Sequence, residues 1–123
     1  MKRLLKTKTK GEFMYHRRLK CYQLAMAMTK VMPELIGTWP RGYSYLSDQL
    51  KRAMASIVLN IAEGNARTSA LERKRFFTVA RASASEVSSI MDIIFAYQLI
   101  DESKFDELQD NLIQIIKILY KLR

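Results

Sequence analysis

One group of polar side chains in this sequence could do chemistry together. Between residues 42 and 63, polar residues recur at offsets of three or four, which places them on one helical face: Gln49, Arg52, Ser56, Asn60 and Glu63. Arg81 lies on a facing polar line of the next helix, in a run of small residues. Two interpretations stay open. We favour a structural network in which Asn60, Glu63 and Arg81 satisfy one another and fix the helix register. The alternative is a ligand-binding face.

Other candidates for catalysis are isolated residues. The chain has one histidine, His16, and one cysteine, Cys21, five residues apart and so on different faces of a helix. The carboxylates of Glu102, Asp106 and Asp110 lie in the opening part of the last predicted helix, where the helix dipole favours acidic side chains. The sequence contains no P-loop, dinucleotide-binding, HExxH or CxxC motif. We therefore expect no enzymatic activity, no catalytic residue, no metal and no cofactor.

Breaks in the helical pattern divide the chain into four segments. The breaks lie at residues 37–42 (GTWPRG), 63–69 (EGNARTS) and 100–103. Pro33 falls late in the first segment, where we expect it to kink the helix or begin its end. No segment alternates with the period of a strand, so the fold class is all-α.

Helix caps and short loops predict how the segments assemble. Ser69 can cap the third helix, with Glu72 at capping-box spacing, and Asp101 or Ser103 can cap the last. Each segment carries an apolar stripe, and short loops make successive helices antiparallel neighbours. We expect an antiparallel up-down-up-down four-helix bundle over residues 13–123, preceded by a basic, flexible arm over residues 1–12.

The first and last helices are polar along only one narrow line. The line on the last helix contains Asp110, Gln114, Lys117 and Lys121, and the line on the first contains His16, Lys20, Gln23, Lys30 and Glu34. A bundle needs to bury only one face of each helix, and a large exposed apolar patch usually marks an interface. We expect a homo-oligomer through these two helices. An unusually apolar monomer surface is the alternative.

The charge of the chain favours a polyanionic partner. Lys and Arg number 21 against 12 Asp and Glu, a formal charge of +9. Residues 1–81 hold 17 basic and 5 acidic side chains, and residues 82–123 hold 4 and 7. RNA or DNA is the expected partner, and a merely solubilising surface is the alternative. The lone cysteine, and the lack of a signal peptide or membrane span, predict a cytoplasmic protein that does not bind membranes.

The expected nucleic-acid contacts are basic side chains that neutralise phosphates without reading bases. On the arm, which could also be a solvated tail without a role, they are Lys2, Arg3, Lys6, Lys8 and Lys10. On the helices they are Arg17, Arg18, Lys20, Lys51, Arg67, Arg73, Lys74 and Arg75. We expect binding with little sequence discrimination.

Residues 46–67, LSDQLKRAMASIVLNIAEGNAR, carry a resemblance to a known family. The stretch resembles the signature of bacterial four-helix-bundle proteins encoded in intervening sequences of large-subunit rRNA genes, where a Leu-Ser/Thr-Asp-Gln segment leads into Asn-Ile-Ala-Glu-Gly. The resemblance covers about residues 14 to 122. Two positions depart from the pattern: Val58 stands where the family usually has proline, and Tyr22 is the nearest aromatic to a missing Val-Trp motif.

The resemblance implies two possible functions. The family includes accessory variability determinants of diversity-generating retroelements, which form homopentamers and bind a reverse transcriptase and nucleic acid. On that basis the expected function is a pentameric, non-catalytic nucleic-acid-binding scaffold that assists such a reverse transcriptase. The alternative is an rRNA- or ribosome-associated bundle encoded in an rRNA intervening sequence.

Overall fold

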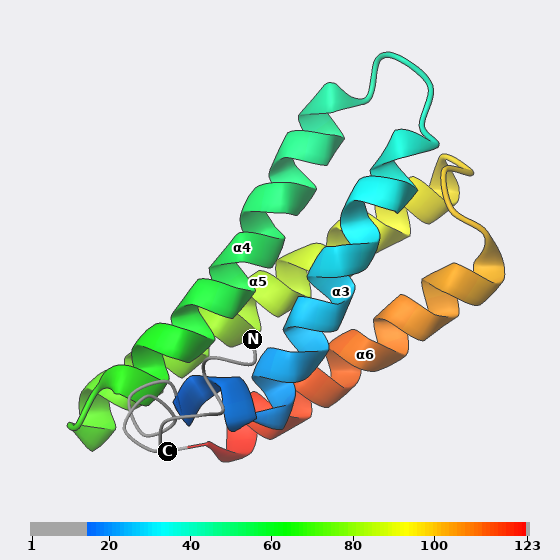
Figure 1. Cartoon of the computed structure of the whole chain (residues 1–123). Helices are drawn as coiled ribbons and strands as arrows, with labels where there is room; N and C mark the ends of the chain where they lie inside the picture. The colour runs from blue at the N-terminus through cyan, green and yellow to red at the C-terminus, as the bar shows by residue number, and fades with distance from the viewer. Residues whose placement is uncertain (1–14, 123) are drawn as a thin grey trace, which may run out of the picture.

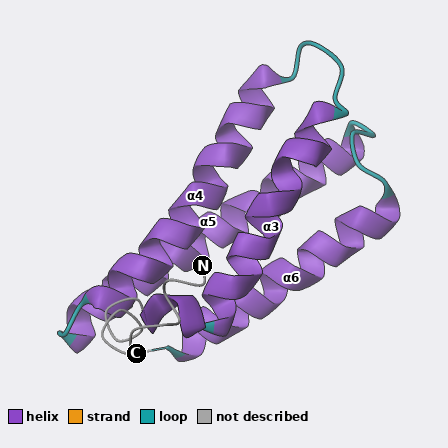
Figure 2. Ribbon diagram, viewed as in Figure 1, coloured by secondary structure: helices purple, strands orange, loops and turns teal. Residues whose placement is uncertain are grey.

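A computed structural model describes residues 15–122. A 3-10 turn, η1 (Tyr15–Arg18), precedes four α-helices, which are α3 (Lys20–Gly37), α4 (Ser44–Ala66), α5 (Ala70–Ala96) and α6 (Glu102–Lys121) (Figure 1). The described residues contain no strand, as Figure 2 shows. The predicted all-α class with four helices is therefore confirmed. The arm predicted over residues 1–12 lies outside the described residues, as do residues 13, 14 and 123.

The helices pack as a ring of neighbours. Helix α4 packs against α5, α5 against α6, and α3 against both α4 and α6, while η1 packs against α3 and α4. Along α4 and α5 the order of contacts is reversed, because Gln49 meets Glu86 near one end and Gly64 meets Phe77 near the other. The loops after α3 and α5 lie at one end of the molecule and the loop after α4 at the other (Figure 1).

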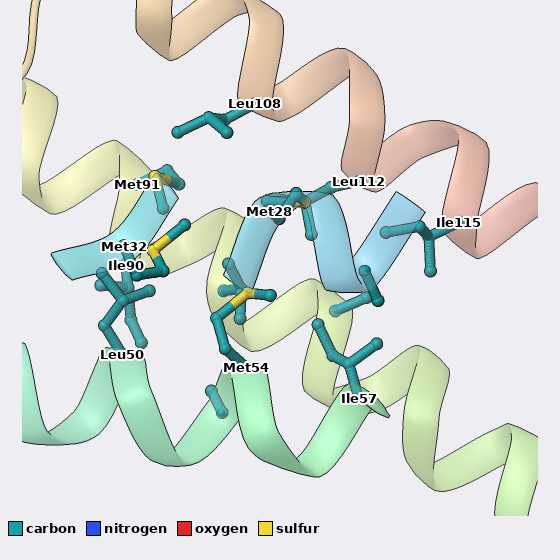
Figure 3. Close-up of a cluster of buried hydrophobic side chains, with 14 of the residues drawn as sticks. Met28, Met32, Leu50, Met54, Ile57, Ile90, Met91, Leu108, Leu112 and Ile115 are labelled. Carbon is teal, nitrogen blue, oxygen red and sulfur yellow. The ribbon is translucent and has the colours of Figure 1, made fainter. Parts of the chain in front are cut away.

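The core is built of methionine, leucine, isoleucine and small residues from all four helices. Figure 3 shows Met28, Met54 and Leu112 directed into the space between the helices near mid-bundle. Each is at most 2% exposed. Burial of these apolar side chains supplies the main favourable term in folding. No helix within residues 15–122 combines the length and apolar character needed to cross a membrane.

The predicted caps are confirmed, and the second predicted break is shorter than expected. The Ser69 hydroxyl accepts the Glu72 amide at 3.3 Å, and the Asp101 carboxylate accepts the Lys104 amide at 2.7 Å. Helix α3 includes Pro33 and ends at Gly37, so Pro33 lies close to the end of the helix, as expected. Helix α4 continues past residue 63 and ends at Ala66, and α5 begins at Ala70, so the break predicted over residues 63–69 is confined to residues 67–69. Tertiary packing against Phe77 outweighs the weak helix propensity of Gly64.

The apolar surface of the first helix is covered within the single chain. The large hydrophobic side chains of α3 are buried or half-buried, because α4, α6 and η1 pack around this helix. The expectation of a large exposed apolar patch on α3 is therefore wrong. The exposed large hydrophobics are Tyr15 on η1, Tyr45 and Leu59 on α4, Leu71, Val79, Ile93 and Phe95 on α5, Tyr97 just after α5, and Ile113 and Tyr120 on α6.

Candidate nucleic-acid interface

Positive charge is concentrated at one end of the bundle. When each helix is divided at its middle, one half of the molecule consists of residues 15–28, 56–82 and 112–122, which we call the basic half. It contains ten basic side chains, namely Arg17, Arg18, Lys20, Arg67, Arg73, Lys74, Arg75, Arg81, Lys117 and Lys121. It contains two acidic ones, Glu63 and Glu72.

The opposite half, residues 29–55 and 83–111, has the reverse balance, and we call it the acidic half. It holds five basic residues, Lys30, Arg41, Lys51, Arg52 and Lys104. It holds nine acidic ones, Glu34, Asp48, Glu86, Asp92, Asp101, Glu102, Asp106, Glu107 and Asp110. The charges thus divide along the bundle axis, whereas the sequence suggested a division between the first two-thirds of the chain and the rest. A polyanion would be drawn to the basic half.

Three predicted contacts lie where the chain enters the bundle. Arg17 and Arg18 belong to η1, a separate turn packed against α3 and α4, and Lys20 is the first residue of α3. Arg17 is half-buried, whereas Arg18 and Lys20 are exposed. The Arg18 guanidinium carbon lies 5.9 Å from the centroid of the Tyr15 ring. Arg18 and Lys20 are therefore the accessible cations of this segment.

The junction between α4 and α5 uses two predicted contacts for its own structure. Arg73 is half-buried; its Nη1 donates to the backbone carbonyls of Asn65 at 3.1 Å and Arg67 at 3.3 Å. It thereby satisfies carbonyls at the end of α4, where helices leave them without partners. The Arg67 guanidinium pairs with the exposed Glu63 carboxylate at 2.8 Å and lies 5.0 Å from the centroid of the Phe76 ring. We therefore assign Arg73 a structural role.

Lys74 and Arg75 are the clearest candidates for phosphate contact. Both are exposed in the first turns of α5, and neither side chain has a hydrogen bond or ion pair within residues 15–122. Lys51, also predicted, lies in the acidic half and so apart from them. The five predicted contacts on the arm, Lys2, Arg3, Lys6, Lys8 and Lys10, lie outside the described residues.

Sequence reasoning missed three basic residues of this half. Lys117 and Lys121 belong to a segment that is acidic in sequence, but α6 brings its last turn to the basic end (Figure 1). Arg81 was expected in a polar network; instead its guanidinium carbon lies 4.6 Å from the centroid of the Tyr120 ring. The alternating direction of successive helices could have indicated this grouping, because it places the end of one helix beside the start of the helix before it.

The predicted polar network is present only in part. The Ser56 and Ser83 hydroxyl oxygens lie 2.6 Å apart, and the Asn60 amide donates to the Ser56 carbonyl at 2.8 Å and to its hydroxyl at 3.1 Å. Gln49 donates to Glu86 at 3.5 Å, a long contact at the surface. These bonds link α4 to α5 or lie within α4, as the structural interpretation expected.

The predicted partnership of Asn60 with Glu63 and Arg81 is wrong. Glu63 is exposed and pairs with Arg67, one turn further along α4. Arg81 stacks on Tyr120, and Arg52 is exposed without a hydrogen bond or ion pair within residues 15–122. Long charged side chains of these helices reach solvent or α6, so only the short polar ones remain at the α4–α5 contact.

The isolated candidates for catalysis have structural environments. Cys21 is fully buried, and this burial raises the pKa of its thiol, which disfavours the reactive thiolate. The His16 ring packs edge-on against Tyr22 with centroids 4.9 Å apart. Burial, and secondarily the positive charge of Arg17, lower the pKa of His16. Within residues 15–122 no three His, Cys, Asp or Glu side chains are grouped so that they could hold a metal ion.

The four helices and the charge distribution of residues 15–122 define the class of this protein. It is an all-α, four-helix protein with a basic half and an acidic half. A family model described as 23S rRNA-intervening sequence protein matches residues 17–121. The chain therefore belongs to the 23S rRNA-intervening sequence protein family. A search of curated proteins finds no match to it.

Proposed function

We propose that this protein is a non-catalytic, rRNA- or ribosome-associated scaffold that binds nucleic acid through the basic half of its bundle. One observation carries the proposal, namely that ten basic side chains and two acidic ones share this half. Concentrated positive charge attracts a polyanion and releases the counterions condensed on it. The family description, which names 23S rRNA, favours RNA as that polyanion.

The contacts should supply affinity with little sequence discrimination. Lys74 and Arg75 are exposed point contacts for phosphate, and neither belongs to a recognisable base-reading module. The side-chain contacts of Arg73 and Arg67 stabilise the junction between α4 and α5. Lys74 and Arg75 therefore project from an ordered start of α5. Binding by such a surface weakens steeply as salt rises.

Self-association is part of the same proposal. An up-down-up-down bundle would be the repeating unit, and exposed Leu59, Val79 and Ile113 are candidates for burial between copies. The family resemblance implies a homopentamer, in which weak contacts to one polyanion would repeat and add avidity. Light scattering coupled to gel filtration should give a mass near five times the 14.3 kDa of one chain. A mass of one chain would refute the oligomer.

The narrower role, assistance to a reverse transcriptase of a diversity-generating retroelement, depends on the family resemblance alone. Genomic context separates it from the rRNA-associated role. A neighbouring reverse transcriptase gene with a variable repeat would favour the retroelement. A position inside a 23S rRNA gene would favour the rRNA association. In either case we expect a cytoplasmic protein that uses the same basic half.

Two matched charge reversals test the basic half. K74E/R75E and K51E/R52E each replace an exposed, adjacent Lys-Arg pair on a helix, and each changes the net charge equally. Fluorescence anisotropy with a labelled RNA at about 50 mM salt should show at least about tenfold weaker binding for K74E/R75E. The same variant should reduce the slope of log affinity against log salt, by roughly 0.7 per lost contact on single strands.

K51E/R52E should bind nearly as the parent does, because Lys51 and Arg52 lie in the acidic half. Equal losses in the two variants would show that net charge, and not the basic half, determines binding. Absence of RNA binding by the parent protein at low salt would refute the proposed function. Circular dichroism of both variants checks that the helices are intact.

A further inference from the structure

A groove of about 650 Å³ lies between the start of α5 and the end of α6, inside the basic half. Leu71 and Tyr120 form apolar parts of its lining, and Lys74 and Arg81 provide two cations. None of the lining residues, all within residues 15–122, is acidic. The groove therefore combines apolar surface with uncompensated positive charge.

Tyr120 is the most solvent-exposed large hydrophobic side chain among the described residues, at 73% exposure. The Arg81 guanidinium carbon lies 4.6 Å from the ring centroid, a distance typical of a cation–π contact. This contact holds one side of the ring, and the exposure of the side chain leaves much of its surface open. An exposed aromatic ring beside cations is the usual platform for an unpaired nucleobase.

We propose that this groove binds one unpaired nucleotide of a single-stranded nucleic acid. The base stacks on the Tyr120 ring, and the Lys74 ammonium and Arg81 guanidinium contact its phosphates. This inference rests on the proposed function and narrows it, because it makes the preferred substrate single-stranded. The groove volume falls within the range of small-ligand sites.

A duplex satisfies the cations of this groove but not its aromatic ring. Paired bases are stacked inside the helix, so their faces are not available to Tyr120. A free phosphate or a polyanion without bases would likewise leave the ring unused. The test must therefore separate the contribution of the base from that of the phosphate backbone.

An abasic oligonucleotide makes this separation. Fluorescence anisotropy measures the affinity for three single strands of roughly 12 nucleotides, namely oligouridine, oligothymidine and an abasic strand with the same number of phosphates. The affinity for a duplex of equal length is measured in the same way. The variants are Y120A and Y120F. Y45A, which removes another exposed tyrosine from the start of α4, is the matched control. The parent protein should bind a base-bearing strand about tenfold more tightly than the abasic strand.

In Y120A this preference should disappear, and Y120F and Y45A should keep it. The duplex should bind the parent and Y120A alike. Preference for only one of the two base-bearing strands would also support the groove and would identify RNA or DNA. Equal binding of base-bearing and abasic strands by the parent would overturn the groove while leaving the proposed function intact. Absence of all binding would overturn both.

A second copy of the chain is the competing occupant of the groove. Light scattering of Y120A distinguishes it, because loss of a nucleotide platform leaves the particle mass unchanged. If Y120A lowers the mass and keeps the preference for bases, Tyr120 belongs to an interface between copies and the inference is wrong.

Discussion

Gly64 of α4 lies directly against the ring of Phe77 on α5. A Cβ atom built on Gly64 would be 2.6 Å from Phe77 Cε1 and 3.1 Å from the Cβ of Phe76. Phe77 is 2% exposed, so its ring has little space into which to move. The absence of a side chain at Gly64 therefore allows the close approach of the two helices. The packing of Phe77 and Phe76 therefore favours glycine at position 64 of this chain.

Gly64→Ala should destabilise the protein by about 1–2 kcal/mol. Overpacking a full core costs about 1–3 kcal/mol, and the better helix propensity of alanine returns up to about 1 kcal/mol. Urea denaturation measures the difference. Gly37→Ala is the matched control, because Gly37 also lies in a helix but a Cβ there meets nothing within 4 Å. Equal stabilities of the two variants would contradict the packing argument.

Asn60 and Glu63 should differ in their importance for stability, although the sequence predicts a structural role for both. Asn60→Ala removes two hydrogen bonds to Ser56 at a partly buried site and should cost about 1–2 kcal/mol. Glu63→Ala removes an exposed pair with Arg67, for which about 0–1 kcal/mol is typical. Thermal melts of both single variants check the order. A larger loss for Glu63→Ala would show that it has a buried partner after all.

Local signals in the sequence were sufficient for the elements of the fold. The helical period, the caps at Ser69 and Asp101 and the loop residues predicted four helices, and each cap has its predicted hydrogen bond. Gly64 was misplaced because glycine is a weak helix former, and only the position of Phe77 shows why it is needed inside α4.

The candidate site was less predictable than the fold. The basic residues could be named, but their grouping depends on which helix ends meet in space. Lys121 joins the basic half although its segment of sequence is acidic, and Lys51 is left out although its segment is basic. Arg73 and Arg75 are chemically alike, and only the carbonyls near Arg73 distinguish their roles.

Arg73 and Arg75 should therefore respond oppositely to substitution. Arg73→Ala removes bonds to two carbonyls and a contact 5.5 Å from the centroid of the Phe77 ring, so it should cost about 1–2 kcal/mol of stability. Arg75→Ala changes an exposed side chain and should leave stability within about 0.5 kcal/mol. In RNA-binding assays on folded protein, Arg75→Ala should bind RNA more weakly than the parent protein, and Arg73→Ala should bind as the parent does. Weaker binding by a fully stable Arg73→Ala would instead make Arg73 a phosphate contact.

Acidification should destabilise the protein through His16. Burial, followed by the charge of Arg17, holds the pKa of His16 in the folded chain below its ordinary value of 6.5. The unfolded chain therefore binds the proton first, and protonation favours unfolding. The free energy of unfolding should fall as the pH drops through about 6.5 and level off below the folded pKa. His16 is the only histidine, so His16→Gln should flatten this dependence between about pH 7.5 and pH 5.5. Urea denaturation in a phosphate-free buffer measures it. A gain in stability on acidification would instead mean that an anionic group holds His16 in its charged form.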